Sequence, residues 1–592
     1  MILISLWLLL YGSFALVRPP LLDDADSVHA EVAREMVARH YWTTLYANGI
    51  RYLEKAPLLY WSIAASFRCF GAQAWAARLP LALYTLVLLI AVFALGRRCF
   101  GDALAGFYAA LVLATCFGMF IFARILIPDA IVCLWLTLAM LCFWRSLAQP
   151  TRWSAAGFAA SCALGVLTKG LIGLVFPLLI VVVYLAMTRN LGHLKRWHPL
   201  LGGLIFLAIA TPWHVAAGLA NPTEGHPGPL PTPGNVHGWY WFYFVNEHLL
   251  RYLNRRVPRD YDTVPLALFW GLLLVWMLPW SIFLPSALRC VPLRHWWRRA
   301  ALGDAERARL LCFVWAAVPM VFFSFSTRQE YYVLPALPAL ALLVGDRLSR
   351  DIPIAQTARG AAAAGSSRVR WKWLLFAGGL CGAAVAVFFA VHSGAPRGDL
   401  SAALSTNPGD YALSFGHFLD LSGRAMAFFR VPLLLTAVAL LVGTGGYLVL
   451  RGHAAIGALT AGAVLFLVAA HMALVTFSPV LSSAALADAI RPLLKPDDVI
   501  VLNGEYESGS TLGFYLHRQL RILNGRSSNL WYGSFFRDAP PIFDDDASIA
   551  QLWAGPRRVF LLTDAAHPPH LSGAVYTVAV SGGKAVLSNR AE

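Results

Sequence analysis

The sequence predicts a polytopic α-helical membrane protein with a small α/β domain at its C-terminal end. Of the 592 residues, 58% are hydrophobic and only 13% are charged, whereas soluble domains are about 45–50% apolar and about 25% charged. The apolar residues gather in long runs, many of them close to the length that crosses a bilayer as a helix. This composition excludes an ordinary cytosolic enzyme, a disordered chain and a fibrous protein.

Thirteen apolar runs approach the roughly 17–25 residues that a helix needs to span a bilayer. They lie near 2–17, 76–96, 103–122, 127–144, 153–168, 170–187, 199–217, 264–286, 309–325, 331–345, 373–391, 431–450 and 455–476. The first run is short for a span. It has no basic segment before it and no cleavage site of small residues after it, so we expect a membrane anchor rather than a signal peptide.

Basic residues gather in every second loop between these runs, which predicts that those loops are cytoplasmic. With thirteen spans and a cytoplasmic N-terminus, the following fall on that side: Arg97, Arg98, Arg145, Arg152, Arg189, Lys195, Arg196, the basic residues of 289–309, the run 347–372 and Arg451. A net charge of +16 in a soluble protein would suggest a nucleic-acid partner. Short basic loops beside apolar spans account for it here, so we expect membrane lipids and no nucleic acid as partners.

The opposite side of the membrane then holds the loops 18–75 and 218–263 and the segment 477–592. That last segment alternates strand-like runs with helix-like ones, which is typical of a small α/β domain. The strand-like runs are 499–502, 520–523 and 559–562, and the helix-like runs are 511–518 and 548–553. We therefore divide the chain into a membrane domain, 1–476, and a soluble domain, 477–592, in which we find no cofactor fingerprint.

Three acids, Asp23, Asp24 and Asp26, begin the first outer loop just ahead of a helical pattern. Apolar residues from Val28 to Met36 form one stripe, which predicts an amphipathic helix lying at the membrane interface. Carboxylates at a helix start often cap free backbone N–H groups. Three acids within four residues exceed what one cap needs, so we expect at least one to serve in chemistry.

The same loop later carries Tyr52-Leu53-Glu54-Lys55, followed by an apolar stretch with two aromatic residues. A lysine at such a water–lipid boundary can extend its ammonium group toward water without any further role. The functional alternative is a cation placed to hold a lipid-linked phosphate.

Other ionisable residues lie at the outer ends of the expected spans, where a charge near the bilayer usually marks function or pairing. They are Arg124, Asp129, Lys169, Arg328, Glu330, and the group Glu247, His248 and Arg251. Glu247 and His248 are the candidate ligands of a divalent metal ion, although neighbours on a helix diverge by about 100°. The nine cysteines contain no CxxC pair and lie mostly in apolar runs, so we expect buried thiols.

Several of these motifs resemble, in kind and order, those of the aminoarabinose transferase and protein-mannosyltransferase superfamily of GT-C fold. They are the acidic cluster before Ala30-Glu31-Val32-Ala33-Arg34-Glu35-Met36, then Asn48-Gly49-Ile50, Tyr52-Leu53-Glu54-Lys55-Ala56-Pro57, Ala77-Arg78-Leu79-Pro80, Thr168-Lys169-Gly170, the Asn246–Arg251 stretch, Ser324-Phe325-Ser326 and Tyr332-Val333-Leu334-Pro335. The resemblance covers residues 15–345, and the C-terminal third agrees only in layout.

The resemblance implies a GT-C fold with about thirteen spans, a periplasmic C-terminal domain and a place in the bacterial inner membrane. It also implies a polyprenyl-phosphate sugar as donor and a catalytic Asp within an Asp-Glu pair. Counting back without gaps from Ala30-Glu31 puts Ala25 at the Asp and Asp26 at the Glu, so the catalytic acid is Asp24 or Asp26, or the helix starts one residue differently. Lys55 matches the family's phosphate-binding lysine, and Tyr331 or Tyr332 matches a tyrosine near the phosphate.

We therefore expect an inverting glycosyltransferase that acts on a lipid A-like lipid, another glycolipid or a protein. Lys55, with Lys169, Arg328 and the two tyrosines, would bind the donor phosphate, and Asp24 or Asp26 would receive the proton of the acceptor hydroxyl. The further expected substrate-binding residues are His29, Glu54, Arg124, Asp129, Glu247, His248 and Arg251. No cofactor is required and a divalent ion is optional. The rival functions are a lipid-linked sugar transporter or flippase and a non-catalytic scaffold.

Overall fold

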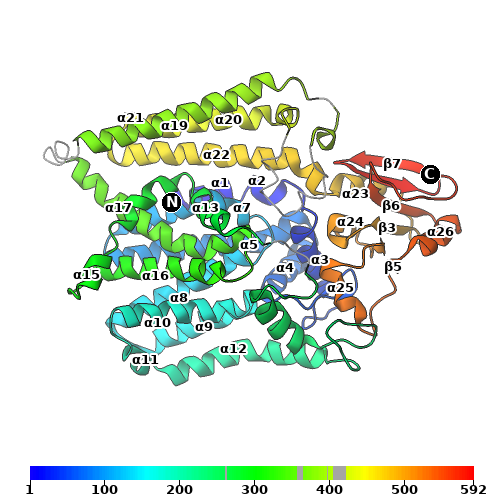
Figure 1. The fold of residues 1–592 in the computed structure, drawn as a ribbon, viewed down its shortest axis with the longest axis horizontal. Coiled ribbons are helices and arrows are strands. Elements are labelled where there is room, and N and C mark those ends of the chain that lie inside the picture. Colours follow the sequence, from blue (N-terminus) through cyan, green and yellow to red (C-terminus); the bar gives the residue numbers. More distant parts are fainter. Residues whose placement is uncertain (260–262, 357–364, 397, 405–421, 592) are drawn as a thin grey trace.

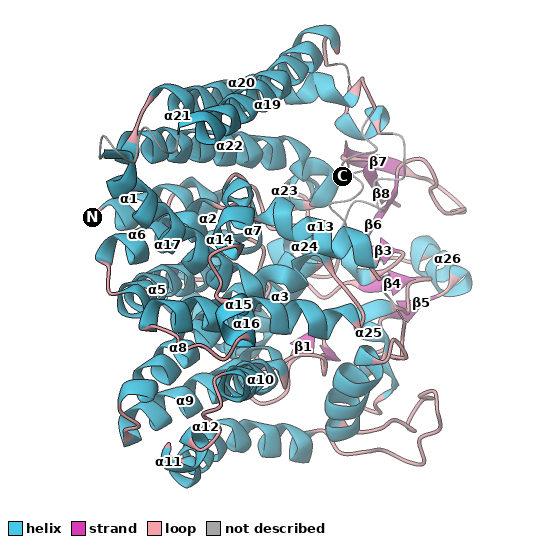
Figure 2. Cartoon of the chain, turned by 60° about the vertical axis from the view of Figure 1, so that its left-hand side comes forward, coloured by secondary structure: helices cyan, strands magenta, loops and turns pink. Residues whose placement is uncertain are grey.

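The computed structural model describes residues 1–259, 263–356, 365–396, 398–404 and 422–591. Long helices run side by side through most of the molecule, and a mixed sheet with short helices lies at one end of them (Figures 1 and 2). The end that carries the sheet is also where the first outer loop lies, so one side of the helical part holds both.

Every apolar run expected from the sequence corresponds to a helix or to a helix with a break. In chain order the helical part contains α1 (Ile2–Leu10), α2 (Phe14–Val17), α5 (Ala74–Phe100), α6 (Ala103–Thr115), α7 (Phe117–Phe122), α8 (Asp129–Ala148), α9 (Arg152–Lys169), α10 (Ile172–Met187), α11 (His193–Arg196), α12 (Pro199–Ala220), α13 (Leu266–Trp276), η2 (Trp280–Phe283), α14 (Leu284–Leu288), α15 (Leu293–Trp297), α16 (Asp304–Ser324), η3 (Glu330–Ala336), α17 (Leu337–Gln356), α19 (Gly365–His392), η7 (Ala425–Phe429), α20 (Arg430–Leu440), η8 (Leu441–Gly445), α21 (Gly446–Val449) and α22 (Gly452–Leu481). The basic run 347–372 lies partly outside the described residues, as do residues 260–262 of the second outer loop.

Within the described residues, eight helices are long and apolar enough to cross a membrane, or nine if the bent pair Leu266–Trp276 and Trp280–Trp297 forms one span. Shorter apolar helices lie at Ile2–Val17, Ala103–Thr115 and Ile172–Met187. The run expected at 103–122 is shorter as a helix because the backbone is extended at Cys116, between α6 and α7. The molecule is thus a multi-pass helical membrane protein. In the described part of the chain, eight or nine of the thirteen expected spans are single helices long and apolar enough to cross a membrane.

Small residues let the central helices α5, α6 and α17 approach closely. A Cβ atom on Gly106 of α6 would lie 2.4 Å from the carbonyl oxygen of Phe93, and one on Gly345 of α17 would lie 2.4 Å from the backbone nitrogen of Ala109. Without a hydrophobic driving force between helices in lipid, such close backbone packing is a main source of helix association.

The first outer loop contains α3 (Ala25–Ala38), the hairpin β1 (Tyr46–Ala47) and β2 (Ile50–Arg51), and α4 (Leu58–Phe70). Asn48 and Gly49 form the hairpin turn with φ of 52° and 82°, the left-handed geometry that an Asn-Gly pair favours. Ten of the fourteen residues of α3 are buried, because it packs against α4 and against α24 (Ser510–Leu516) of the C-terminal domain. The expected surface-lying amphipathic helix is therefore an internal helix between the two parts of the protein.

The C-terminal domain is built on a six-stranded sheet of order β5-β4-β3-β6-β8-β7. The first four strands in that order pair in parallel, and β8 pairs antiparallel with both neighbours. The strands are β3 (Val499–Asn503), β4 (Arg521–Leu523), β5 (Phe543–Asp544), β6 (Val559–Asp564), β7 (Tyr576–Ser581) and β8 (Lys584–Ser588), and the helical turns and helices are α23 (Ala484–Ile490), η9 (Tyr506–Ser508), α24, α25 (Ser528–Trp531), η10 (Gly533–Phe535) and α26 (Asp546–Ala554). The three expected strands and two expected helices are confirmed. Helix α22 continues to Leu481, so the expected boundary at residue 476 lies inside it.

Glu507, in η9, is a buried carboxyl group at the junction of the two parts. One of its oxygens accepts a hydrogen bond from the backbone N–H of Asn529 at 2.9 Å, and the other makes no hydrogen bond with the described residues. Burial raises the pKa of Glu507 from 4.5 to about 7. The hydrogen bond from Asn529 opposes that rise, and the charges of Glu505 and Glu54 add to it.

This raised pKa predicts that Glu507→Gln changes how stability depends on pH. Below pH 4.5 the carboxyl is protonated in both the folded and the unfolded chain. As pH rises from 4.5 to about 7, the native protein loses roughly 3 kcal/mol of stability, because over this range the carboxyl ionises in the unfolded chain but stays protonated in the fold. Thermal unfolding in detergent should show the variant close to wild type at pH 5 and more stable at pH 8. The exposed Glu505→Gln should keep most of the wild-type dependence, because burial raises the pKa of Glu507 more than the charge of Glu505 does. Parallel curves for Glu507→Gln and wild type would contradict the prediction.

Candidate active site

A chain of five alternating charges links the first outer loop to the segment around the π-helix η1 (Trp241–Leu250). The Lys55 ammonium lies 3.1 Å from a Glu54 carboxylate oxygen, and the other Glu54 oxygen accepts from Arg256 at 2.6 Å. Arg256 also pairs with Glu247, which pairs in turn with Arg251 at 2.9 Å. The three inner members are buried, whereas the side chains of the terminal cations Lys55 and Arg251 are 27% and 20% exposed.

Glu247, one of the inner carboxylates of this chain, stays ionised although it is buried. Burial alone would raise the pKa of Glu247, but Arg256, Arg251 and Lys55 lower it to about 2. Because a buried charge without its partner is costly, each member holds the others in place. The arrangement therefore presents two partly exposed cations on a rigid base.

A second cluster faces this chain and consists of Asp129, Lys169, Tyr331 and Tyr332. The Lys169 ammonium lies 2.5 Å from a carboxylate oxygen of Asp129 and 5.0 and 4.9 Å from the ring centroids of the two tyrosines. Asp129 begins α8, Lys169 ends α9 and the tyrosines lie on η3, so three helix ends meet here. Asp129 is close enough to Lys55 and Arg251 to interact electrostatically with both, which brings the two clusters into one polar region.

Asp24 lies on the edge of the same region. Its carboxylate interacts electrostatically with Tyr331, and its side chain does not cap α3 even though it is the residue before that helix. Its backbone has φ 67° and ψ −116°, a conformation that costs a residue with a Cβ on the order of 1–3 kcal/mol. The capping interpretation of this acid is therefore wrong, and the strained backbone directs the side chain elsewhere.

His29, one turn further along α3, is a neutral imidazole beside Lys55. Its Nδ1 donates to the carbonyl of Ala25 at 2.5 Å, while its buried Nε2 makes no hydrogen bond with the described residues. Burial, and then the charge of Lys55, lower the pKa of His29 to about 3. It can therefore accept a hydrogen bond at this site but carries no charge.

His248 and Gly170 explain why the Thr168-Lys169-Gly170 motif needs its glycine. The His248 Nε2 accepts from the backbone N–H of Leu171 at 3.1 Å, and its Nδ1 donates to the carbonyl of Tyr243 at 2.5 Å. Gly170 has φ 79°, and a Cβ there would lie 2.1 Å from the His248 Nε2. His248 thus positions the end of α9, which carries Lys169.

The expected metal ligands Glu247 and His248 do not fit a metal ion in this arrangement. Both oxygens of Glu247 pair with arginines, and both ring nitrogens of His248 make hydrogen bonds to the backbone. Nor do the described parts of the chain bring three or more His, Cys, Asp or Glu side chains into a group that could hold one.

Asp26 and Arg124 belong to a separate buried network around the start of α3. Asp26 pairs with Arg78 at 3.0 Å and accepts from the backbone N–H of Leu126 at 2.8 Å. Arg124 contacts His471 and lies 4.5 Å from the ring centroid of Phe120. One Asp26 oxygen accepts from Arg78 and from a second backbone N–H, and the other accepts from Leu126. Both oxygens are therefore occupied by contacts that hold the fold together.

The hydrogen bonds of Arg328 go to residues outside the two clusters. It donates to the backbone carbonyls of Val264, Ser324 and Ser326 at 2.8 to 3.2 Å, so it ties two loops together. Conversely, Arg256 is not among the residues expected from the sequence, although it is central to the ion-pair chain. The available signal was its place in an outer loop, where the positive-inside rule makes an arginine unusual.

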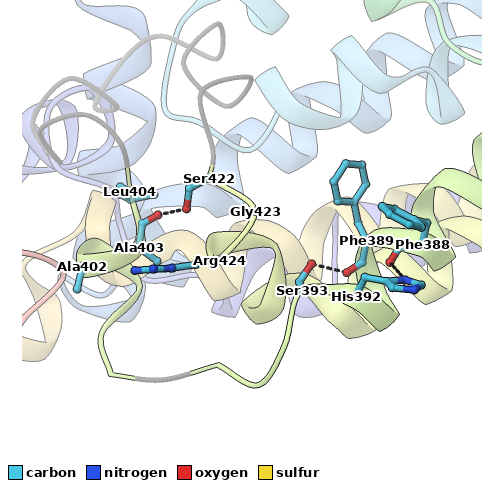
Figure 3. A pocket seen from close by; sticks show the side chains of 10 residues that line it. All are labelled: Phe388, Phe389, His392, Ser393, Ala402, Ala403, Leu404, Ser422, Gly423 and Arg424. Atoms are coloured by element: carbon cyan, nitrogen blue, oxygen red, sulfur yellow. Dashed lines mark hydrogen bonds between the residues drawn. The ribbon is translucent and has the colours of Figure 1, made fainter.

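A hollow of about 700 Å³ lies away from these clusters, between the end of α19 and the start of η7 (Figure 3). Its hydroxyl and imidazole groups are largely engaged: Ser393 and His392 donate to carbonyls of their own helix, and Ser422 donates to Ala403. It therefore offers little of the chemistry that the charged region offers.

Comparison with known proteins supports the resemblance seen in the sequence. Residues 54–215 match the family model described as dolichyl-phosphate-mannose-protein mannosyltransferase. An undecaprenyl phosphate-alpha-4-amino-4-deoxy-L-arabinose arabinosyl transferase of Aeromonas salmonicida is 31% identical over 353 residues, and one of Aeromonas hydrophila is 28% identical over 349. Each match spans 58% of this chain and 58% of the relative's length.

Solved structures show the same architecture over the whole chain. The crystal structure of ArnT from Cupriavidus metallidurans bound to undecaprenyl phosphate has a TM-score of 0.76 and 23% identity, and covers 100% of this chain and 97% of that one. The apo crystal structure of that protein gives a TM-score of 0.75. The chain thus has the fold of that transferase, the GT-C fold, and over 58% of its length it is similar in sequence to the aminoarabinose transferases.

Proposed function

We propose that the protein is an inverting glycosyltransferase that moves a sugar from an undecaprenyl-phosphate donor to a hydroxyl group of a lipid A-like acceptor. The observation that carries this proposal is the ion-pair chain, whose partly exposed ends are cations, together with the Asp24 carboxylate, which interacts electrostatically with Tyr331 of the facing cluster. The donor class comes from the names of the relatives and from the undecaprenyl phosphate in the similar crystal structure.

In this proposal Lys55 and Arg251 bind the donor phosphate. Both are cations with exposed area, and the buried carboxylates behind them prevent their side chains from moving away. Tyr331 and Tyr332, held against Lys169, close the same site and add hydroxyl donors. Cations placed where charge develops on a leaving phosphate lower the barrier of the displacement.

Asp24 would act as the base on the acceptor hydroxyl. The hydroxyl oxygen forms the new bond to the anomeric carbon from the face opposite the phosphate, and its proton passes to Asp24. The bond between the anomeric carbon and the phosphate oxygen breaks, and its electron pair leaves with undecaprenyl phosphate. One such displacement inverts the anomeric centre.

We further propose that this site and the C-terminal domain face the periplasm. Support comes from the basic loops, which the positive-inside rule assigns to the opposite side. A periplasmic site suits a lipid-linked donor, because such a donor carries its own activated phosphate and needs no nucleotide. A protein hydroxyl as acceptor remains the second candidate within the same chemistry.

The transport alternative makes a different demand on the site. A transporter of lipid-linked sugars needs no base for an acceptor hydroxyl, whereas the proposed site includes the Asp24 carboxylate, which interacts electrostatically with Tyr331. Reconstituted protein should therefore transfer sugar between lipids in the same leaflet and should not move the donor across the bilayer.

Asp24→Asn should lower kcat by about 10²- to 10⁴-fold, because it removes the base while keeping the shape of the side chain. The measurement is sugar transfer from an undecaprenyl-phosphate-linked donor to lipid A by purified protein. Asp26→Asn is the matched variant two residues away, and we expect it to lower thermal stability by breaking the Arg78 ion pair. Near-normal transfer by folded Asp24→Asn would rule out this assignment.

Lys55→Met should weaken donor binding more than it slows the chemical step. It removes a charged phosphate contact worth roughly 1.5–3 kcal/mol, which corresponds to about a 10- to 150-fold rise in the donor KM. The inner pair of Glu54 and Arg256 remains, so the fold should persist. Arg328→Gln serves as a control and should leave the donor KM unchanged; an equal effect of both substitutions would argue against the phosphate site.

A further inference from the structure

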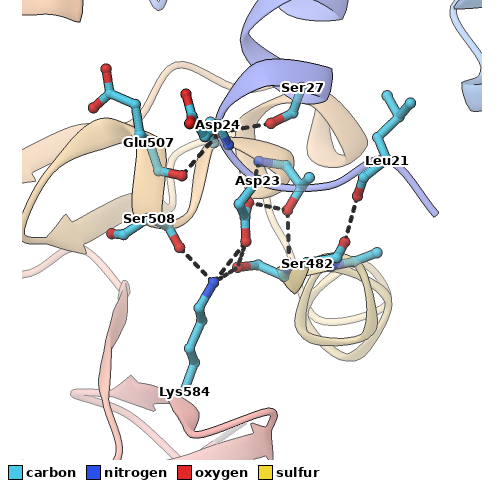
Figure 4. A network of polar contacts seen from close by, with 12 residues as sticks. Leu21, Asp23, Asp24, Ser27, Ser482, Glu507, Ser508 and Lys584 are labelled. Carbon is cyan, nitrogen blue, oxygen red and sulfur yellow. Dashed lines mark hydrogen bonds and ion pairs between the residues drawn. The ribbon is translucent and has the colours of Figure 1, made fainter. Parts of the chain in front are cut away.

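The end of α22 and the C-terminal domain together hold the segment just before α3 by hydrogen bonds, and Figure 4 shows the one between Leu21 and Ser482. The backbone N–H of Leu21 donates to the Tyr515 hydroxyl at 2.8 Å, and its carbonyl accepts from Ser482 at 2.6 Å. The backbone N–H of Asp23 donates to the carbonyl of Leu481 at 2.8 Å. The backbone that leads to Asp24 is therefore held by another part of the chain.

Asp23 lies at the centre of these contacts, and both oxygens of its carboxylate accept hydrogen bonds. One oxygen accepts from the backbone N–H and the hydroxyl of Thr511 at 2.8 and 2.5 Å, and the other accepts from Ser483 at 2.8 Å and Lys584 at 2.7 Å. Lys584 also donates to the carbonyl of Ser508 at 2.6 Å. We refer to Asp23, Ser483, Thr511 and Lys584 as the Asp23 clasp.

The next residue, Asp24, is held by a separate contact. Its backbone N–H donates to the Ser510 hydroxyl at 3.0 Å, and that hydroxyl also contacts the Ser27 hydroxyl at 2.7 Å. These contacts lie on both sides of the left-handed φ of 67° at Asp24. Figure 4 shows the side chains of Asp23 and Asp24 leaving the backbone in different directions, with Asp23 toward Lys584.

We propose that the Asp23 clasp and Ser510 position Asp24 for catalysis, so that the C-terminal domain forms part of the working active site. An unsupported loop would relax out of the strained conformation and turn the Asp24 carboxylate away from Tyr331. This inference rests on the proposed function, because it assumes that Asp24 is the base.

Docking of the domain does not depend on the clasp alone. Asn48 makes two hydrogen bonds with Leu520, and Arg51 pairs with Asp538 at 2.7 Å, both at the β1–β2 hairpin. Loss of one clasp residue should therefore leave the domain in place while it frees Asp24. This separates a positioning role from a role in holding the domain on.

The test compares Lys584→Met, Ser510→Ala and Lys584→Arg in full-length protein, with Asp538→Asn as a docking control. We expect the first two to lower kcat at least tenfold with the donor KM within twofold of wild type. Lys584→Arg should restore much of the rate, and Asp538→Asn should leave it unchanged. Limited proteolysis in detergent reports whether the domain is still docked.

The decisive measurement combines each change with Asp24→Asn. If the clasp acts through Asp24, Lys584→Met and Ser510→Ala should cost little further rate in that background, because the base is already absent. Equal losses in both backgrounds, or single variants within twofold of wild type, would overturn the proposal. Normal activity of Asp24→Asn alone would instead refute the assignment of Asp24 as the base and so the proposed function.

Discussion

The pairing of buried charges at the outer end of the helices is the constraint on which the site depends. Glu54, Arg256 and Glu247 are almost fully buried, so none of them could remain in the fold without the other two. Their pairing joins the loop before α4 to the segment around η1, although about 200 residues separate them. The two partly exposed cations, Lys55 and Arg251, are thereby held by buried carboxylates rather than by flexible loops.

This constraint also explains the composition of the surrounding elements. Gly170 leaves room for His248, whose two backbone hydrogen bonds hold the end of α9. Lys169 then lies between Asp129 and the two tyrosines of η3. Residues that look like separate boundary charges in the sequence are thus parts of two facing clusters.

The sequence predicts the helices well because apolar runs of bilayer length leave few alternatives, and the helices found at all thirteen runs agree with it. It does not predict their breaks, such as the one at Cys116, because helix length there is set by packing. The expected strands also leave out β7 and β8, although Tyr576–Ser581 and Lys584–Ser588 are rich in apolar and β-branched residues and flank two glycines, a pattern typical of a hairpin.

The site residues also differ in how far the sequence alone identifies them. Lys55, Asp129, Lys169 and Tyr331 are recognisable because each is polar beside an apolar run. Arg328 and Arg124 share that signal, but one ties loop carbonyls and the other contacts His471, and only the tertiary structure separates these cases.

The three acids before α3 show the same point most sharply, because they lie within four residues and have three different environments. Asp26, inside the helix, meets Arg78. Asp23 meets Lys584 from a strand at the far end of the chain. Asp24 differs from both because its left-handed backbone keeps its side chain from capping the helix start, and its carboxylate interacts electrostatically with Tyr331. Because a left-handed φ is costly for an aspartate, the contacts that maintain it must come from elsewhere, and the C-terminal domain supplies them.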